Sequence, residues 1–145
     1  MSYTTYSFDD VSMVISHPSF GQFIASGTGV GSISVEMLTE RSAHDIAADG
    51  SVMVSKIKGR NGNVSVAAQQ TSGLHKWLLK LYNYLEAAGA GRWAEIAIIV
   101  RAPMMKDLIV CTGVSFNKLP TRPYQATGQM ITWSLMAADI QQDVA

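Results

Sequence analysis

The chain has few charged residues and no excess of either sign, and both features narrow what it can be. Asp, Glu, Lys and Arg make up 15% of its 145 residues, with 11 acidic and 11 basic side chains, whereas an average soluble domain carries about 25%. Balanced charge argues against a protein that grips nucleic acid or an anionic membrane by bulk charge. A surface poor in charge indicates that much of the exterior is covered by further copies of the chain.

The chain also lacks a second cysteine and any long apolar run. Cys111 has no partner for an intramolecular disulfide. The first residues lack the basic and apolar segments of a secretory signal, and no run approaches the roughly 18 apolar residues of a membrane span. We therefore expect folding in a reducing cytoplasm, no membrane partner, and a single domain over residues 1–145.

Strand signals dominate what is present. Over residues 31–38, aliphatic side chains alternate with Ser32, Ser34 and Glu36, which predicts one dry and one wet face. Further strands are predicted, from similar runs bounded by glycine, proline or polar turn residues, at 11–17, 20–26, 51–60, 63–70, 94–101, 107–116 and 128–136.

One segment predicts a helix. It begins after a capping hydroxyl at Thr71 or Ser72 and ends near Gly89, which we expect in the left-handed conformation. Its apolar residues recur at steps of three and four and form one stripe that must pack on a sheet. The stripe consists of Leu74, Trp77, Leu78, Leu81 and Leu85.

The sharpest local signal is a hairpin turn at Asn61-Gly62, because both residues tolerate positive φ. Pairing the flanking strands about this turn places Lys58 opposite Ser65 on a polar face and sorts the aliphatic residues onto the other. A ribbon over 51–70 fits a closed β-sandwich with a solvated face. It fits equally a strand pair that is donated to a larger intermolecular barrel, and the residues alone leave both open.

No motif points to catalysis, a cofactor or a metal. His17, His44 and His75 are scattered without metal-ligand spacing, and Cys111 lies in an apolar stretch typical of a buried thiol. An acid/base pair at 44–49 and a small-ligand-binding β-barrel stay open as alternatives. The favoured interpretation is a protein that is not an enzyme and needs no cofactor.

Several segments together resemble the tail tube proteins of contractile-tailed bacteriophages of the myovirus type. They are residues 2–8 (SYTTYSF), 15–18 (ISHP), 44–56 (HDIAADGSVMVSK) and 69–78 (QQTSGLHKWL), and the resemblance covers nearly the whole chain. It implies a mainly β fold, an antiparallel β-sandwich or barrel with one flanking α-helix and an extended β-hairpin. The tube of type VI secretion systems shares that fold.

The resemblance also implies a function. The chain would be a structural virion protein, assembled in the host cytoplasm, whose hexameric rings stack into the tail tube that conducts DNA during ejection. Implied partners are further copies of itself, the sheath protein outside, baseplate and tail terminator proteins at the ends, and the tape measure protein and DNA transiently in the lumen. On the order of 24 strands, about 4.8 Å apart and tilted by roughly 40°, would leave a bore of ~40 Å. A type VI secretion-like or other contractile-injection inner tube is the alternative.

Two sets of residues are expected to contact what surrounds a subunit. The wet face of the ribbon and of the preceding strand is expected to line the bore, where Glu36 would neutralise lysines of the same or a neighbouring subunit. The charged stretch 39–50 is expected to form a loop between stacked rings. The lumen residues are Ser32, Ser34, Glu36, Lys56, Lys58, Ser65 and Gln69, and the inter-ring residues are Glu40, Arg41, His44, Asp45 and Asp49.

Overall fold

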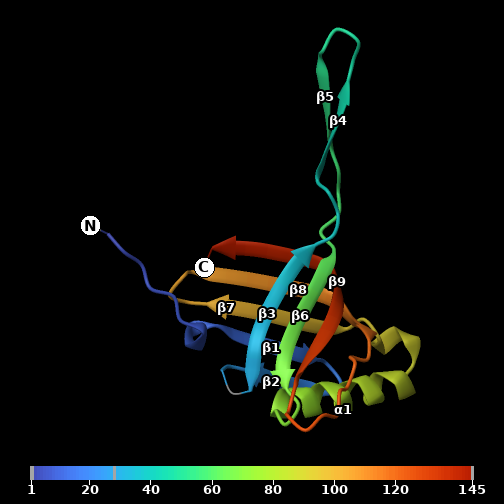
Figure 1. The fold of residues 1–145 in the computed structure, drawn as a ribbon. Coiled ribbons are helices and arrows are strands. Elements are labelled where there is room, and N and C mark those ends of the chain that lie inside the picture. Colours follow the sequence, from blue (N-terminus) through green and yellow to red (C-terminus); the bar gives the residue numbers. More distant parts are fainter. Residues whose placement is uncertain (1, 28, 145) are drawn as a thin grey trace.

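A computed structural model describes residues 2–27 and 29–144, and it shows a curled antiparallel sheet, one helix and a hairpin that projects away from both (Figure 1). The 7-stranded sheet has the order β2-β1-β7-β8-β9-β6-β3. The mainly β class with one α-helix is as predicted. The strands of this sheet are β1 (Ser12–His17), β2 (Gly21–Ala25), β3 (Val30–Met37), β6 (Gly62–Gln69), β7 (Ile96–Ala102), β8 (Asp107–Lys118) and β9 (Met130–Val144).

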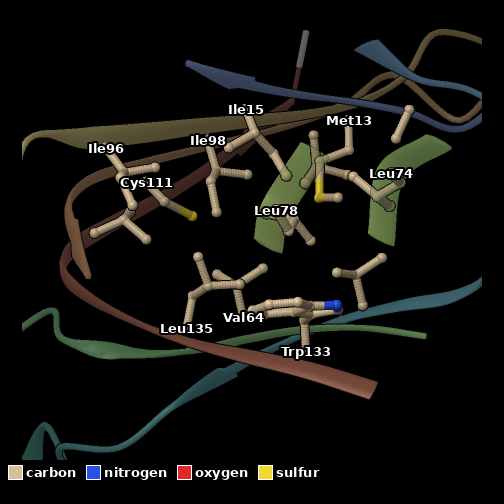
Figure 2. Close-up of a cluster of buried hydrophobic side chains, with 14 of the residues drawn as sticks. Met13, Ile15, Val64, Leu74, Leu78, Ile96, Ile98, Cys111, Trp133 and Leu135 are labelled. Carbon is tan, nitrogen blue, oxygen red and sulfur yellow. The ribbon is translucent and has the colours of Figure 1, made fainter. Parts of the chain in front are cut away.

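The curl of the sheet brings two walls face to face across the core (Figure 2). Met13 and Ile98, on β1 and β7, lie on one wall, and Val64 and Trp133, on β6 and β9, lie on the other. All four are fully buried. β1 and β6 bury every second side chain, because successive residues of a strand point to opposite faces. Burial of one large aliphatic side chain contributes about 1.5–3 kcal/mol, so the core is what closes the curl.

The helix α1 (Gly73–Ala87) packs between the walls and contacts β2 and β6. Its first turn is capped by Ser72, whose hydroxyl accepts a hydrogen bond from the His75 N–H at 3.2 Å. Within residues 2–27 and 29–144, no helix is long and apolar enough to cross a membrane. The four leucines of the apolar stripe lie in the core, namely Leu74, Leu78, Leu81 and Leu85.

Trp77 packs against the body as expected, but the end of the helix differs from the prediction. Trp77 is only partly buried, and its ring packs against the rings of Phe20 and Phe23 at the rim of the core. The prediction of a left-handed helix end at Gly89 is wrong, because that residue has a φ of −69° and lies just before the short 3₁₀ helix η2 (Ala90–Arg92). The helix ends instead at Ala87, and the residue that follows it, Ala88, is extended. A second 3₁₀ turn, η1 (Phe8–Asp10), precedes β1.

The hairpin predicted over 51–70 is wrong. β6 pairs with β3 and β9, so Ser65 lies opposite Ser34 and Ser134 and does not face Lys58. Gly62 has no positive φ. A Cβ at that position would lie 2.1 Å from the Glu36 carbonyl oxygen, so glycine is required by the close approach of two strands. The Asn-Gly pair therefore marks a crowded strand start, not a turn.

The projecting hairpin consists of β4 (Ser42–Ile46) and β5 (Val52–Lys56), and with its stalk, residues 39–60, we call it the arm. Figure 1 shows the arm rising from the junction of β3 and β6. Its strands pair from Ser42 with Lys56 to Ile46 with Val52, and Gly50 takes a φ of +88° in the turn. The loop predicted over 39–50 is therefore corrected to one strand and the start of a turn.

Candidate assembly surfaces

The outer face of β3, β6 and the part of β9 that pairs with β6 (130–137) is mostly polar, apart from half-exposed Met130 and Met136, and we call it, together with the end of β8, the polar wall. Cross-strand register aligns small side chains of neighbouring strands into rows. The same strands send their other side chains into the core, so strand parity alone separates the wet face from the dry one. The rows are Ser34, Ser65 and Ser134, then Ser32, Ala67 and Thr132, all at least partly exposed.

The last residues of β8 widen the polar wall to four strands. Lys118 lies opposite Ser134 after a register shift, and both line a surface cleft together with Thr132. The pairing of β8 with β7 reaches only to Val114, so the end of β8 pairs with β9 alone. Among the described residues, the wall therefore has the order β8-β9-β6-β3 and an unpaired backbone edge on each side.

The structure brings five of the seven expected lumen residues onto this wall. Ser32, Ser34 and Glu36 on β3 and Ser65 and Gln69 on β6 share one face. This grouping agrees with the alternation in the sequence, although no bore is present in a single chain.

The two lysines expected beside them lie elsewhere. Lys56 pairs with Ser42 at the end of β5, and Lys58 lies in the stalk of the arm. The prediction that they lie opposite β6 on the polar wall is wrong, because β5 pairs with β4. The sequence reasoning missed Lys118, Thr132 and Ser134, although the alternation of 130–136 with apolar neighbours is a usable signal.

The arm exposes apolar side chains that its own chain does not cover. Ile46, Val52 and Val54 are 70%, 50% and 62% exposed. They share a face, because Ile46 pairs with Val52 and His44 with Val54. No residue of β4 or β5 is buried. A contiguous exposed apolar face of this kind indicates an interaction surface.

The arm is also polarised in charge. Its base carries four cations, and its tip carries Asp45 and Asp49. The side-chain hydroxyl and then the backbone N–H of Ser51 donate to the Asp49 carboxylate at 2.7 and 3.0 Å, and these bonds lower the pKa of that carboxyl. The tip therefore stays negative at neutral pH. The cations around the cleft at the base are Arg41, Lys56, Lys58 and Arg60.

All five expected inter-ring residues lie in the arm and are exposed. Glu40 and Arg41 lie in the stalk, His44 and Asp45 lie on β4, and Asp49 lies in the turn. The arm brings them onto one projecting element, with the charges separated along its length.

Of the residues weighed as chemical candidates, His17, His75 and Cys111 are packed into the body, whereas residues 44–49 are exposed on the arm. Trp133 donates its indole N–H to Nδ1 of buried His75 at 3.0 Å, which ties α1 to β9. Burial, and then the charges of Arg122 and Lys76, lower the pKa of His75. Burial, and then Asp139, raise the pKa of Cys111 to about 11, so its thiol stays protonated. No group of three or more potential metal ligands occurs within residues 2–27 and 29–144.

Solved structures with the same curled sheet and helix belong to contractile injection systems. The chain superposes on a protein of the anti-feeding prophage baseplate with a TM-score of 0.63 at 11% identity, covering 99% of this chain and 98% of that one. It superposes on a protein of the PVC sheath-tube complex in the extended state with a TM-score of 0.61 at 8% identity, covering 99% and 93%. The anti-feeding prophage tube-terminating cap gives 0.61 at 9% identity, covering 100% and 94%.

These likenesses define the fold class as that of contractile-injection tube components. No curated protein matches the sequence. The family model of the bacteriophage PhiTE tail tube protein matches residues 3–145, and the chain belongs to this family of structural, non-enzymatic tail tube proteins. Membership places the protein in the tail of a virion.

Proposed function

We propose that copies of this chain form hexameric rings that stack into a phage tail tube and conduct DNA during ejection. The chain belongs to a tail tube family, and the observation that carries the proposal is its polar wall. This wall is four strands wide and has an unpaired edge on each side. Unpaired edges tend to pair with another chain, and closing a sheet into a barrel removes them. Repetition of the wall around a ring would give such a barrel.

The chemistry of the wall suits a conduit. Its rows are built mainly of serine, threonine and alanine, which offer DNA no strong fixed charge. Lysines that bind phosphate strongly would retard passage of DNA. Lys56 and Lys58 lie in the arm, away from the rows of the wall. We infer that Ser32, Ser34, Glu36, Ser65 and Gln69 line the bore and that the two arm lysines do not.

We assign contact between rings to the arm. Stacking rings head to tail is a heterologous contact, in which one surface meets a different surface on the next copy. The arm extends beyond the body and carries an exposed apolar face with opposite charges at its ends. Its exposed residues Glu40, Arg41, His44, Asp45 and Asp49 would give these contacts their specificity.

The family and the fold support a proposal for the wider assembly. The similar structures come from a sheath-tube complex, a tube-terminating cap and a baseplate. A tube of this chain would likewise contact a sheath outside and terminator and baseplate proteins at its ends, with tape measure protein and then DNA inside. We expect its assembly in the host cytoplasm. The likeness to non-phage injection systems favours a second candidate, the inner tube of such a system with another cargo.

Electron microscopy of the purified protein tests the proposal. We expect rings and stacked tubes with a bore of ~40 Å, without added metal, nucleotide or nucleic acid. Sedimentation velocity on the same sample should show species much larger than the subunit. A strictly monomeric protein at millimolar concentration, without rings on any grid, would rule the tube out. An Ile46→Asp variant in the arm serves as a control that should keep rings but lose stacked tubes.

A further inference from the structure

The polar wall carries one acidic and one basic residue, and they lie at opposite edges. Glu36 lies on the edge strand β3, and Lys118 lies at the end of β8. Both side chains are exposed. Among the described residues, the ion pair of the chain joins Arg60 to Asp139 and involves neither of them. Each edge of the wall therefore presents one charge, of opposite sign to that of the other edge.

The two edges are compatible in direction. β8, β9, β6 and β3 are antiparallel in sequence, so β3 runs opposite to β8. β3 of one copy can therefore continue into β8 of the next as another antiparallel pair. The polar faces of both copies then lie on the same side, and the core faces on the other.

We propose that Glu36 of one copy forms an ion pair with Lys118 of the next copy, and that this pair sets the register between subunits. The inference rests on the proposed tube and names the contact that joins its subunits. Lys118 lies in the row of Ser34, and Glu36 lies two residues further along β3 on the same face. A barrel of tilted strands requires successive copies to be offset along the strand. If β3 of one copy is shifted by about two residues along β8 of the next, Glu36 lies directly opposite Lys118. If the shift is about four residues, Glu36 lies diagonally across from Lys118, still within reach of a long side chain.

Register needs such a device because the two central rows of the wall are nearly uniform. Small serine, alanine and threonine side chains distinguish poorly between registers that differ by two residues. If β3 of one copy slipped by one residue along β8 of the next, its polar side chains would point towards the core, which the packing of the core forbids. A slip of two residues keeps the polar side chains on the outer face, so the core does not prevent it. Opposite charges at the junction favour one of these registers. The same pair leaves each junction neutral towards DNA in the bore.

A charge exchange tests the pair. Glu36→Lys and Lys118→Glu each place like charges at every junction, and each should lower the assembled fraction about five- to tenfold. The double exchange restores opposite charges with their places swapped, and it should return assembly to within about threefold of the unmodified chain. Raising the salt concentration should improve the single variants most, because screening weakens repulsion. The Glu86→Lys variant, on the exposed side of α1, controls for the change in net charge.

The outcomes separate this inference from the tube itself. Single variants that assemble normally, or a double variant no better than either single, would overturn the pair while rings of the unmodified chain still supported the tube. A chain that forms no rings at all would overturn both.

A direct contact test uses cysteines. The double variant Glu36→Cys and Lys118→Cys should form covalent dimers and higher multimers on mild oxidation. The control with Glu86→Cys and Lys118→Cys should stay mainly monomeric, and Cys111 is buried and should not interfere. Equal cross-linking in both variants would count against the proposed register.

Discussion

The body and the arm are both antiparallel β-structure, yet they use apolar residues in opposite ways. Strands β1 and β6 bury every second residue, whereas β4 and β5 bury none. Most valines and isoleucines of the body lie in a shared core, whereas Ile46, Val52 and Val54 on the arm are at least half exposed. The same residue types therefore stabilise the fold of the body, whereas in the arm they are available to contact another molecule. Stability and assembly should be separable by mutation.

The largest loss of stability is expected from a truncation in the core of the body. Leu78 is fully buried between the walls, and Leu78→Ala should lower the free energy of unfolding by about 2–5 kcal/mol, because it leaves a cavity. The matched truncation Val54→Ala in the arm should change it by less than about 0.5 kcal/mol. Urea unfolding of dilute, dissociated subunits measures both. Similar losses in the two variants would show that the arm is part of the cooperative fold.

The sequence predicted the body better than the arm for a physical reason. Alternation over 31–38 and 63–70 reflects a core within the chain, so the strands were found, and so was the apolar helix stripe. β9 continues to Val144, past the predicted end at 136, because its polar second half is held by pairing with β8, which leaves no apolar alternation to detect.

The arm misled the prediction because its partner strand is not marked by burial. Residues 42–46 expose every side chain, so they look like a polar loop, and 52–56 were then paired with the wrong strand. Asn61-Gly62 strengthened that error, since the residues of a tight turn also suit the close approach to Glu36. The rows of the polar wall were only half predicted, because contacts between distant strands such as β6 and β9 are not encoded locally.

Substitutions on the apolar face of the arm should reduce assembly without reducing the stability of the subunit. Replacing Ile46 and Val52, which pair on the apolar face of the arm, with serine should leave the unfolding free energy of the subunit nearly unchanged. It should lower the assembled fraction more than tenfold, because each side chain contributes about 1.5–3 kcal/mol when buried. Sedimentation velocity measures the loss. Met53→Ser, on the other face of the arm, is the matched control, and a double variant that still forms tubes would show that this face contacts nothing.

A smaller change in stability is expected with pH, and it should arise from His75 in the body. The folded-state pKa of His75 is lowered below its ordinary value of 6.5, first by burial and then by Arg122 and Lys76. Above pH 6.5 the ring is neutral in both states, and its contribution to stability is complete. As the pH falls below 6.5, the unfolded chain binds the proton more readily, so the unfolding free energy decreases.

Protonation would also remove the acceptor that His75 offers to Trp133. Chemical unfolding between pH 7.5 and 5 should show a decline that His75→Gln flattens, since glutamine can still accept from the indole. His44→Gln, on the exposed arm, should leave the pH dependence unchanged. An identical decline in the His75→Gln variant would assign the effect to other groups.

The smallest effect is expected at the junction of the two regions. The Nε atom of Arg60 lies 2.7 Å from Asp139 Oδ1, but the two side chains are 52% and 30% exposed, so water screens the pair. Asp139→Asn should therefore lower stability by less than about 1 kcal/mol, and the loss should shrink in high salt. The main-chain bond from the Ile140 N–H to the Arg60 carbonyl, at 2.7 Å, does not depend on the side chain and should hold the arm in place. A double-mutant cycle with Arg60→Gln measures the coupling, and hydrogen exchange at residues 57–60 reports on the attachment. A coupling above about 2 kcal/mol, or rapid exchange in Asp139→Asn alone, would show that the ion pair and not the backbone anchors the arm to the body.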